Sequence, residues 1–215
     1  TNFQQGITGG RAPTVQTFAG SGALGRIVKD HYPFRDESGV KRNTKIAVTF
    51  REGIDPTSFI SDTNANGVFG DCITPAAGTA FSWTQHCDQL DSSAVRIYPS
   101  DQPAAFAAAA VLTQTEGTNQ QYLTFVFRPL ALLGSSTGTV EYTVELTSQI
   151  KKINGDSAFV NERAGKYVWN FETDTVSDLT PPAVSAIYPG HQETVPRNSI
   201  VQITFNDAMD PLTVQ

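Results

Sequence analysis

An eighteen-residue stretch has a near copy later in this sequence, and the repeat limits the folds that the chain can adopt. RNTKIAVTFREGIDPTSF spans residues 42–59, and RNSIVQITFNDAMDPLTV spans residues 197–214. Upstream, Tyr32-Pro33 pairs with Tyr188-Pro189. The spacing is too long for one turn of a solenoid and fits whole domains of roughly 100–150 residues in tandem. Identical residues at matching positions are Arg42 and Arg197, Asn43 and Asn198, Thr49 and Thr204, Phe50 and Phe205, Asp55 and Asp210, and Pro56 and Pro211.

Alternation of apolar and polar residues with period two predicts strands, and no segment carries a sustained helical stripe. About seven strands separated by turns are typical of an antiparallel β-sandwich, so the expected fold class is all-β. The alternating segments are residues 26–32, 44–51, 94–98, 107–113, 122–127, 139–147 and 166–172. The core candidates are Ile46, Val48, Phe50, Phe125, Phe127, Val144, Leu146, Val168 and Trp169, with strand register deciding which of each alternating set points inward.

Composition changes divide the chain into four parts. Residues 1–23 are Gly-rich and weakly patterned, which predicts an extended arm or linker. Residues 24–175 hold the strand pattern of the first sandwich, and residues 176–182 form a linker that Pro181-Pro182 stiffens. The pattern restarts at residues 183–215, which we interpret as the start of a second unit.

Charge and motif content argue against several classes of function. The formal net charge is −6 and the basic residues are scattered, which does not suit nucleic acid. The longest apolar run, residues 104–112, is too short to span a bilayer. The three histidines lie far apart and no nucleophile or metalloprotease motif is present, so we expect no catalysis.

The segment TPPAVSAIYPGHQETVPRNSIVQITFNDAMDPLTV, residues 180–214, resembles the opening of the bacterial Ig-like domains that are repeated in S-layer and other bacterial cell-surface proteins. The first unit resembles the same family more loosely, and its end, with YTVEL and YVWNF, resembles the family's closing strands. The second unit carries the family pattern at Pro181, Pro182, Pro189, Gly190, Val195, Pro196, Asn198, Ile200, Phe205, Met209, Asp210, Pro211, Thr213 and Val214, and the first at Pro33, Asn43, Ile46, Phe50, Asp55, Pro56 and Phe59.

The resemblance implies an immunoglobulin-like sandwich in tandem, with the second copy incomplete, and a non-catalytic structural role in an S-layer or other extracellular assembly. Its partners would be copies of itself or other surface proteins. Two alternatives stay open: an adhesin or ligand-binding module that contacts cell-wall or host glycans, and a spacer domain of a larger secreted carbohydrate-active enzyme.

Compared with a minimal unit of that family, the first unit has an insertion at residues 60–93. It contains both cysteines, Cys72 and Cys87, which are either a disulfide that closes a loop or two buried thiols; the even count and the turn-rich setting favour the disulfide.

The insertion also contains a D-x-N-x-N-G pattern typical of calcium loops. Asp62, Asn64, Asn66 and Gly67 would converge oxygen atoms on one point, and Asp71 could close the site with help from Asp88 or Asp91. The competing interpretation is a surface loop without metal, because Asn, Asp and Gly also form turns for reasons of their own.

Two short strands of a second unit bury too little apolar surface to be stable alone. We therefore expect either that the chain continues beyond Gln215, or that a neighbouring subunit adds strands to the sheet. Residues 1–23 are the obvious donor for such an exchange, with residues 14–18 as the strand-like part.

Overall fold

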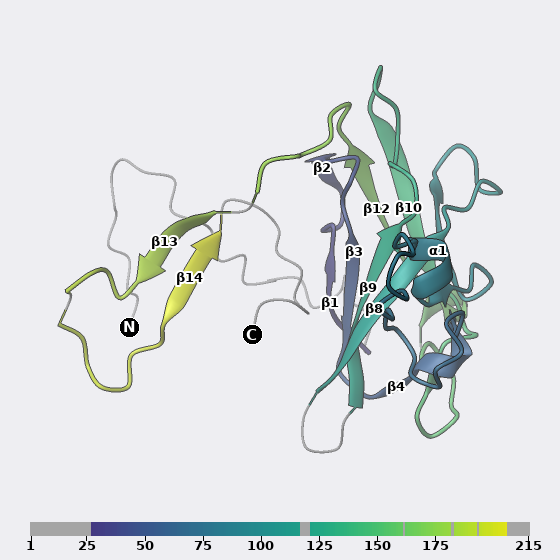
Figure 1. The fold of residues 1–215 in the computed structure, drawn as a ribbon, viewed down its shortest axis with the longest axis horizontal. Helices are drawn as coiled ribbons and strands as arrows, with labels where there is room; N and C mark the ends of the chain where they lie inside the picture. Colours follow the sequence, from purple (N-terminus) through teal and green to yellow (C-terminus); the bar gives the residue numbers. More distant parts are fainter. Residues whose placement is uncertain (1–26, 117–120, 161, 182, 193, 206–215) are drawn as a thin grey trace.

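Residues 27–116, 121–160, 162–181, 183–192 and 194–205 are described by a computed structural model (Figure 1). Two β-sheets pack face to face and enclose one core, so the expectation of an all-β sandwich built from antiparallel sheets is confirmed. The first sheet has the order β1 (Val28–Tyr32), β3 (Ile46–Phe50), β9 (Gln121–Pro129), β8 (Ala109–Glu116), β6 (Gln89–Leu90) and β5 (Ile60–Ser61). The second has the order β2 (Glu37–Val40), β12 (Tyr167–Thr173), β10 (Val140–Leu146) and β7 (Val95–Pro99).

The remaining elements are short. β4 (Ile54–Asp55) pairs with β11 (Lys151–Lys152), and a separate hairpin joins β13 (Val184–Tyr188) to β14 (Gln202–Phe205). Helical structure is limited in the described residues to α1 (Trp83–His86) and two 3-10 turns, Pro56–Ser58 and Arg163–Gly165. The first of these turns begins at the proline of the repeated Asp-Pro, and the Asp55 carboxylate caps it by accepting a hydrogen bond from the Thr57 backbone N–H at 3.0 Å. No helix in the described part of the chain is long and apolar enough to cross a membrane.

Each of the seven segments predicted as strands overlaps a strand in its described residues, because period-two alternation matches the two faces of a sheet. Five strands were missed: β2 and the two-residue strands β4, β5, β6 and β11. β2 begins at Glu37, in a stretch for which no strand was predicted, and it pairs with β12 in parallel rather than antiparallel. Only Val40 of β2 is buried, so this strand carries no alternation that a sequence pattern could show.

The core forms where the inner faces of the two sheets meet. On β3 the buried side chains are Ile46, Val48 and Phe50, whereas on β12 they are those of Tyr167, Trp169 and Phe171. Trp169 is completely buried. The predicted core candidates are buried except Val168, which is half-buried because it alternates with Trp169 and therefore lies on the outer face of β12.

His31 is buried between the sheets and stacks on the core. Its ring centroid lies 4.4 Å from that of Trp169, and its Nδ1 is 2.8 Å from the Pro33 carbonyl oxygen, to which it donates a hydrogen bond. Burial lowers the pKa of the imidazole from its usual value. The second copy has Ile187 at this position, so the histidine is a packing residue of the first unit and no part of the repeat.

The β13–β14 hairpin repeats the β1–β3 pair in backbone detail. Val28 lies opposite Phe50, and Val184 lies opposite Phe205. In both pairs the register then shifts by one residue, and both Tyr–Pro bonds that follow the first strand are cis. The repeat in the sequence is therefore also a repeat in structure.

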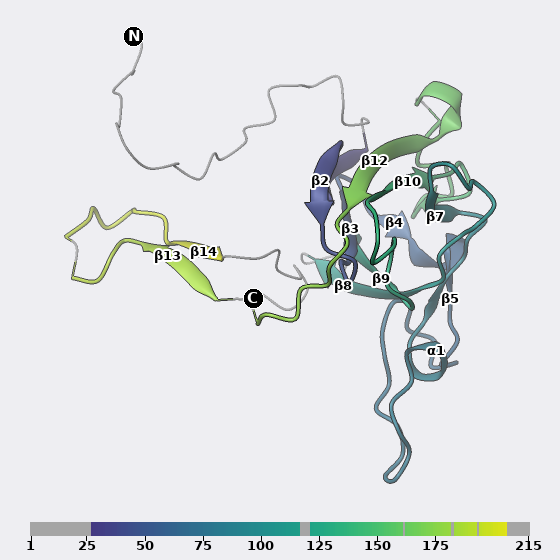
Figure 2. The same cartoon turned by 90° about the horizontal axis from the view of Figure 1, so that it is seen from above.

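The two hairpins differ in what covers them. Val48 is 0% exposed, whereas its counterpart Ile203 is 51% exposed. Ile46 is 0% exposed, and its counterpart Val201 is 69% exposed. In Figures 1 and 2 the β13–β14 hairpin stands apart from the sandwich. Its apolar face is thus the equivalent of a core face without the opposite sheet.

Candidate functional site: the disulfide-tied insertion

The insertion leaves and rejoins the sandwich at one edge of the six-stranded sheet. It starts at β5 and ends at β6, which pair with each other, and β6 pairs with β8 through Gln89 and Ala110. Between these strands the chain extends away from the sandwich as a projection that includes α1 (Figure 2). Such a segment has no sheet of its own to pack on and depends on local interactions for its shape.

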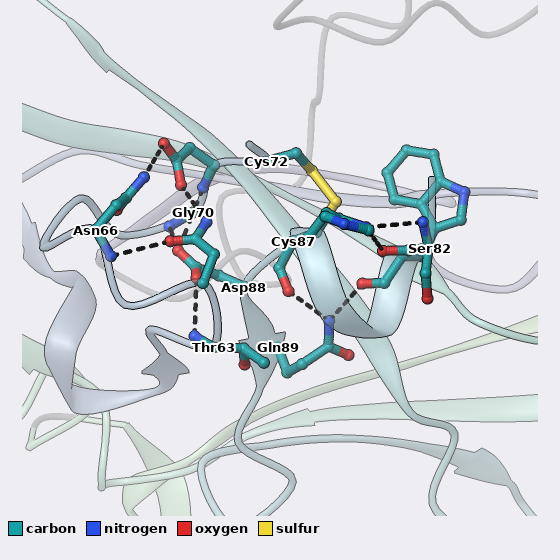
Figure 3. The surroundings of a disulfide bond; sticks show 12 residues. Thr63, Asn66, Gly70, Cys72, Ser82, Cys87, Asp88 and Gln89 are labelled. Atoms are coloured by element: carbon teal, nitrogen blue, oxygen red, sulfur yellow. Dashed lines mark hydrogen bonds between the residues drawn. A yellow bond between two sulfur atoms is a disulfide. The ribbon is translucent and has the colours of Figure 1, made fainter. Parts of the chain in front are cut away.

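The predicted disulfide between Cys72 and Cys87 is confirmed (Figure 3). The Ile73 N–H donates to the His86 carbonyl oxygen at 2.8 Å, so the main chain also pairs beside the disulfide. The cysteines are 15 positions apart, and closing a loop of this size stabilises the fold by on the order of 3 kcal/mol through the unfolded state.

Asp88 is a completely buried carboxylate next to the disulfide, and it organises the base of the projection. Its Oδ1 accepts from the Thr63 N–H at 3.0 Å, and its Oδ2 accepts from the N–H groups of Gly70 at 2.8 Å and Asp71 at 3.4 Å (Figure 3). Burial raises the pKa of this carboxyl group, and the backbone hydrogen bonds act in the opposite direction.

Gly70 is required at its position for two reasons. Its φ is +80°, and a Cβ atom there would lie 2.2 Å from Cγ2 of Thr113. The close approach lets the Thr113 N–H donate to the Gly70 carbonyl oxygen at 2.7 Å, while the Val111 N–H donates to the Asp88 carbonyl oxygen at 2.9 Å. The insertion is therefore hydrogen-bonded along β8.

The four residues predicted to bind calcium lie together and hydrogen-bond to one another. Asp71 accepts from the side-chain amides of Asn64 at 2.8 Å and Asn66 at 2.9 Å, one on each carboxylate oxygen. Asp62 accepts from the backbone N–H groups of Asn66 at 3.2 Å and Gly67 at 2.9 Å. The amide oxygens of Asn64 and Asn66 accept from backbone N–H groups of the same loop.

This arrangement tests the fit of calcium to the loop. The oxygens that a cation would need all accept N–H groups, and Asp88, a suggested helper, accepts only backbone N–H groups. Among the described residues no three or more His, Cys, Asp or Glu side chains are grouped so that they could hold a metal. For calcium to bind, both asparagine amides would have to turn their oxygens toward the position that Asp71 faces, and calcium here stays a prediction.

A cluster of aromatic side chains covers the α1 part of the projection. The ring of Phe81 lies 5.0 Å from that of Trp83 and 5.5 Å from that of His86. The guanidinium of Arg128, on β9, lies 3.9 Å from the centre of the Trp83 ring, a cation–π contact that ties α1 to the sandwich. Phe81 is 46% exposed, so an aromatic surface remains open to solvent.

Sequence reasoning placed the disulfide but missed the two features that shape the projection. The sequence pattern indicates Asp88 only as a metal ligand, and it indicates no role for Arg128. Their partners are backbone groups or rings far along the chain, and no spacing rule connects such positions. The available signal for the exposed cluster was the presence of Phe81, Trp83 and His86 between the two cysteines.

Neither a scan against protein-family models nor a search of curated proteins finds a match to this chain.

Replacing Asp88 by Asn should destabilise the protein by about 1–3 kcal/mol, because an amide –NH₂ would then face backbone N–H donors in a buried place. Urea unfolding measures the change. The matched control is Asp101→Asn, at an exposed aspartate outside the insertion, which should change the unfolding free energy by less than about 0.5 kcal/mol. Equal effects of the two substitutions would show that Asp88 does not organise the loop.

If calcium binds at the loop, the melting temperature of the protein should be higher in millimolar calcium than in EDTA, because a cation that binds only the folded state stabilises it. Asp71→Asn should abolish the difference, whereas Asp156→Asn, in an exposed Asn-Asp turn of the sandwich, should keep it. A wild-type melting curve that is the same in calcium and EDTA would exclude the calcium site.

Proposed function

We propose that this chain is a non-catalytic structural protein of the bacterial cell surface, in which Ig-like β-sandwich units follow one another. The observation that carries the proposal is the hairpin β13–β14, which repeats the register, the register shift and the apolar face of β1–β3. Burying a side chain such as Val201 or Ile203 is worth about 1.5–3 kcal/mol, so an exposed face of several such residues favours a covering sheet.

The extracellular location is supported by the chemistry of the insertion. Disulfides persist in oxidising compartments, and both cysteines of the chain form one. The disulfide closes the projection covalently, beside the hydrogen bonds of Asp88 and the cation–π contact of Arg128. This fits a protein that works outside the cell, next to copies of itself or other surface proteins.

A second candidate function is favoured by the exposed aromatic cluster. Phe81 and Trp83 lie on a projection that the disulfide and Arg128 hold in place, and such rings stack on the apolar faces of sugars. The second candidate is therefore a ligand-binding module whose insertion contacts cell-wall or host glycans.

Antibodies raised against residues 24–175 test the main proposal on cells of the source bacterium. We expect labelling of intact cells, with the protein in the envelope fraction. Labelling that needs cell lysis would contradict a surface role.

Binding of the purified protein to cell-wall and host glycans separates the two candidates. The structural role predicts no binding. The ligand-binding role predicts binding that Phe81→Ser removes and Leu132→Ser keeps, because Leu132 is an exposed apolar residue outside the insertion.

A further inference from the structure

The linker that follows β12, residues 174–178, lies along the segment before β3, residues 40–43. The Asp174 N–H donates to the Val40 carbonyl oxygen at 2.6 Å, and the Arg42 N–H donates to the Val176 carbonyl oxygen at 3.1 Å. The Lys41 ammonium forms an ion pair with Asp174 at 2.8 Å. Residues 174–176 thus continue the strand direction of β12 beyond the end of the sheet.

Asn43 extends this pairing with its side chain. Its Nδ2 donates to the Asp178 carbonyl oxygen at 2.5 Å, and its Oδ1 accepts from the Asp178 N–H at 2.9 Å. The planar amide therefore takes the place of a backbone peptide group opposite Asp178. Both hydrogen bonds need a side chain that carries one donor and one acceptor side by side. The side chains of Asp and Ala do not carry this pair.

Arg42 connects the segment before β3 to the core of the sandwich. Its Nε donates to the Leu133 carbonyl oxygen at 2.9 Å, and the Leu133 N–H donates to the Arg42 carbonyl oxygen at 2.8 Å. Leu133 is buried in the core. The linker is therefore hydrogen-bonded to a segment that is itself anchored in the core.

Beyond Asp178 the chain stays restricted for a few more residues. The Asp178 carboxylate accepts from the Thr180 N–H at 2.7 Å, which forms a local turn, and Pro181 follows with a fixed φ. The chain from Asp178 to Pro181 is thus restricted by a local hydrogen bond and by the proline ring.

Arg42 and Asn43 are the first two residues of the repeated stretch, and their counterparts are Arg197 and Asn198. Both counterparts are exposed and lie just before β14, as Arg42 and Asn43 lie just before β3. Pro196 stands where the first unit has Lys41, so the ion pair to the linker is not part of the repeat. What the two units share is the Arg–Asn pair.

We propose that the Arg–Asn pair of each unit is a docking site for the extended linker that leaves that unit, and that it fixes the direction in which the next unit begins. In the first unit the occupant is residues 174–178. In the second unit Arg197–Asn198 takes a segment of the same kind, an extended backbone that offers one N–H and one C=O to the asparagine amide. The docking at the second unit rests on the proposed tandem arrangement. The docking at the first unit rests on the contacts alone.

The contact of Asn43 with Asp178, which we call the clamp, is tested by electron–electron distance measurement between spin labels at Gln102→Cys on the sandwich and Leu179→Cys on the linker, both at exposed positions. We expect a narrow distance distribution that Asn43→Ala broadens. Asn198→Ala is the matched control: the same residue is removed from the other copy, and the distribution should stay narrow. A distribution that is as broad without the Asn43 substitution as with it would overturn the proposal.

Hydrogen exchange gives a second readout that does not depend on the labels. Loss of the Asn43 side chain should accelerate exchange of the Asp178 amide about fivefold or more, as expected for the loss of a hydrogen bond. Exchange of the core amides of β3 should not change, which shows that the sandwich is still folded. Asp178 exchange that is equally fast in the wild type would also refute the clamp. Neither measurement depends on cellular location, so failure of the clamp and failure of the surface role can be told apart.

Discussion

The burial of one face of β3 is the interaction on which the rest of this structure depends. Ile46, Val48 and Phe50 lie on that face, and they belong to the same buried cluster as Trp169 of the other sheet. A strand pair of this kind is only marginally stable in water by itself, because two strands bury too little apolar surface. The second copy of the same strand pair, with Val201 and Ile203 exposed, shows this face without its cover.

The projection is stabilised in a different way from the sandwich. It has few large buried side chains, and its shape comes from a disulfide, a buried carboxylate and a cation–π contact. Asp88 provides an acceptor for backbone N–H groups that no strand partner satisfies, which is the usual requirement for irregular chain in a buried place. A rigid scaffold that carries a covalently closed loop with exposed rings is suited to making contacts.

Much of the fold could be predicted from the sequence, because strong period-two alternation marks the seven long strands. β2 was not predictable in this way, since three of its four residues are not buried. The choice between Val168 and Trp169 as the inward residue needed the register of β12. The site was predicted less well: the cysteines form their disulfide, but the partners of Asp88 and the clamp between Asn43 and Asp178 join residues far apart in the chain. The repeat nevertheless indicated Asn43, because the Arg–Asn pair occurs at the same position in both copies.

We propose that β13–β14 belongs to a second sandwich in the native protein. Maleimide labelling of Ile203→Cys tests it directly, with Val48→Cys as the buried reference; the two native cysteines are bonded to each other and do not react. In residues 1–215 alone, the thiol at position 203 should react rapidly, in keeping with the exposed Ile203 side chain. In the protein isolated from its source, we expect this thiol to be as protected from maleimide as the one at position 48. Rapid labelling at position 203 in the isolated protein would contradict it.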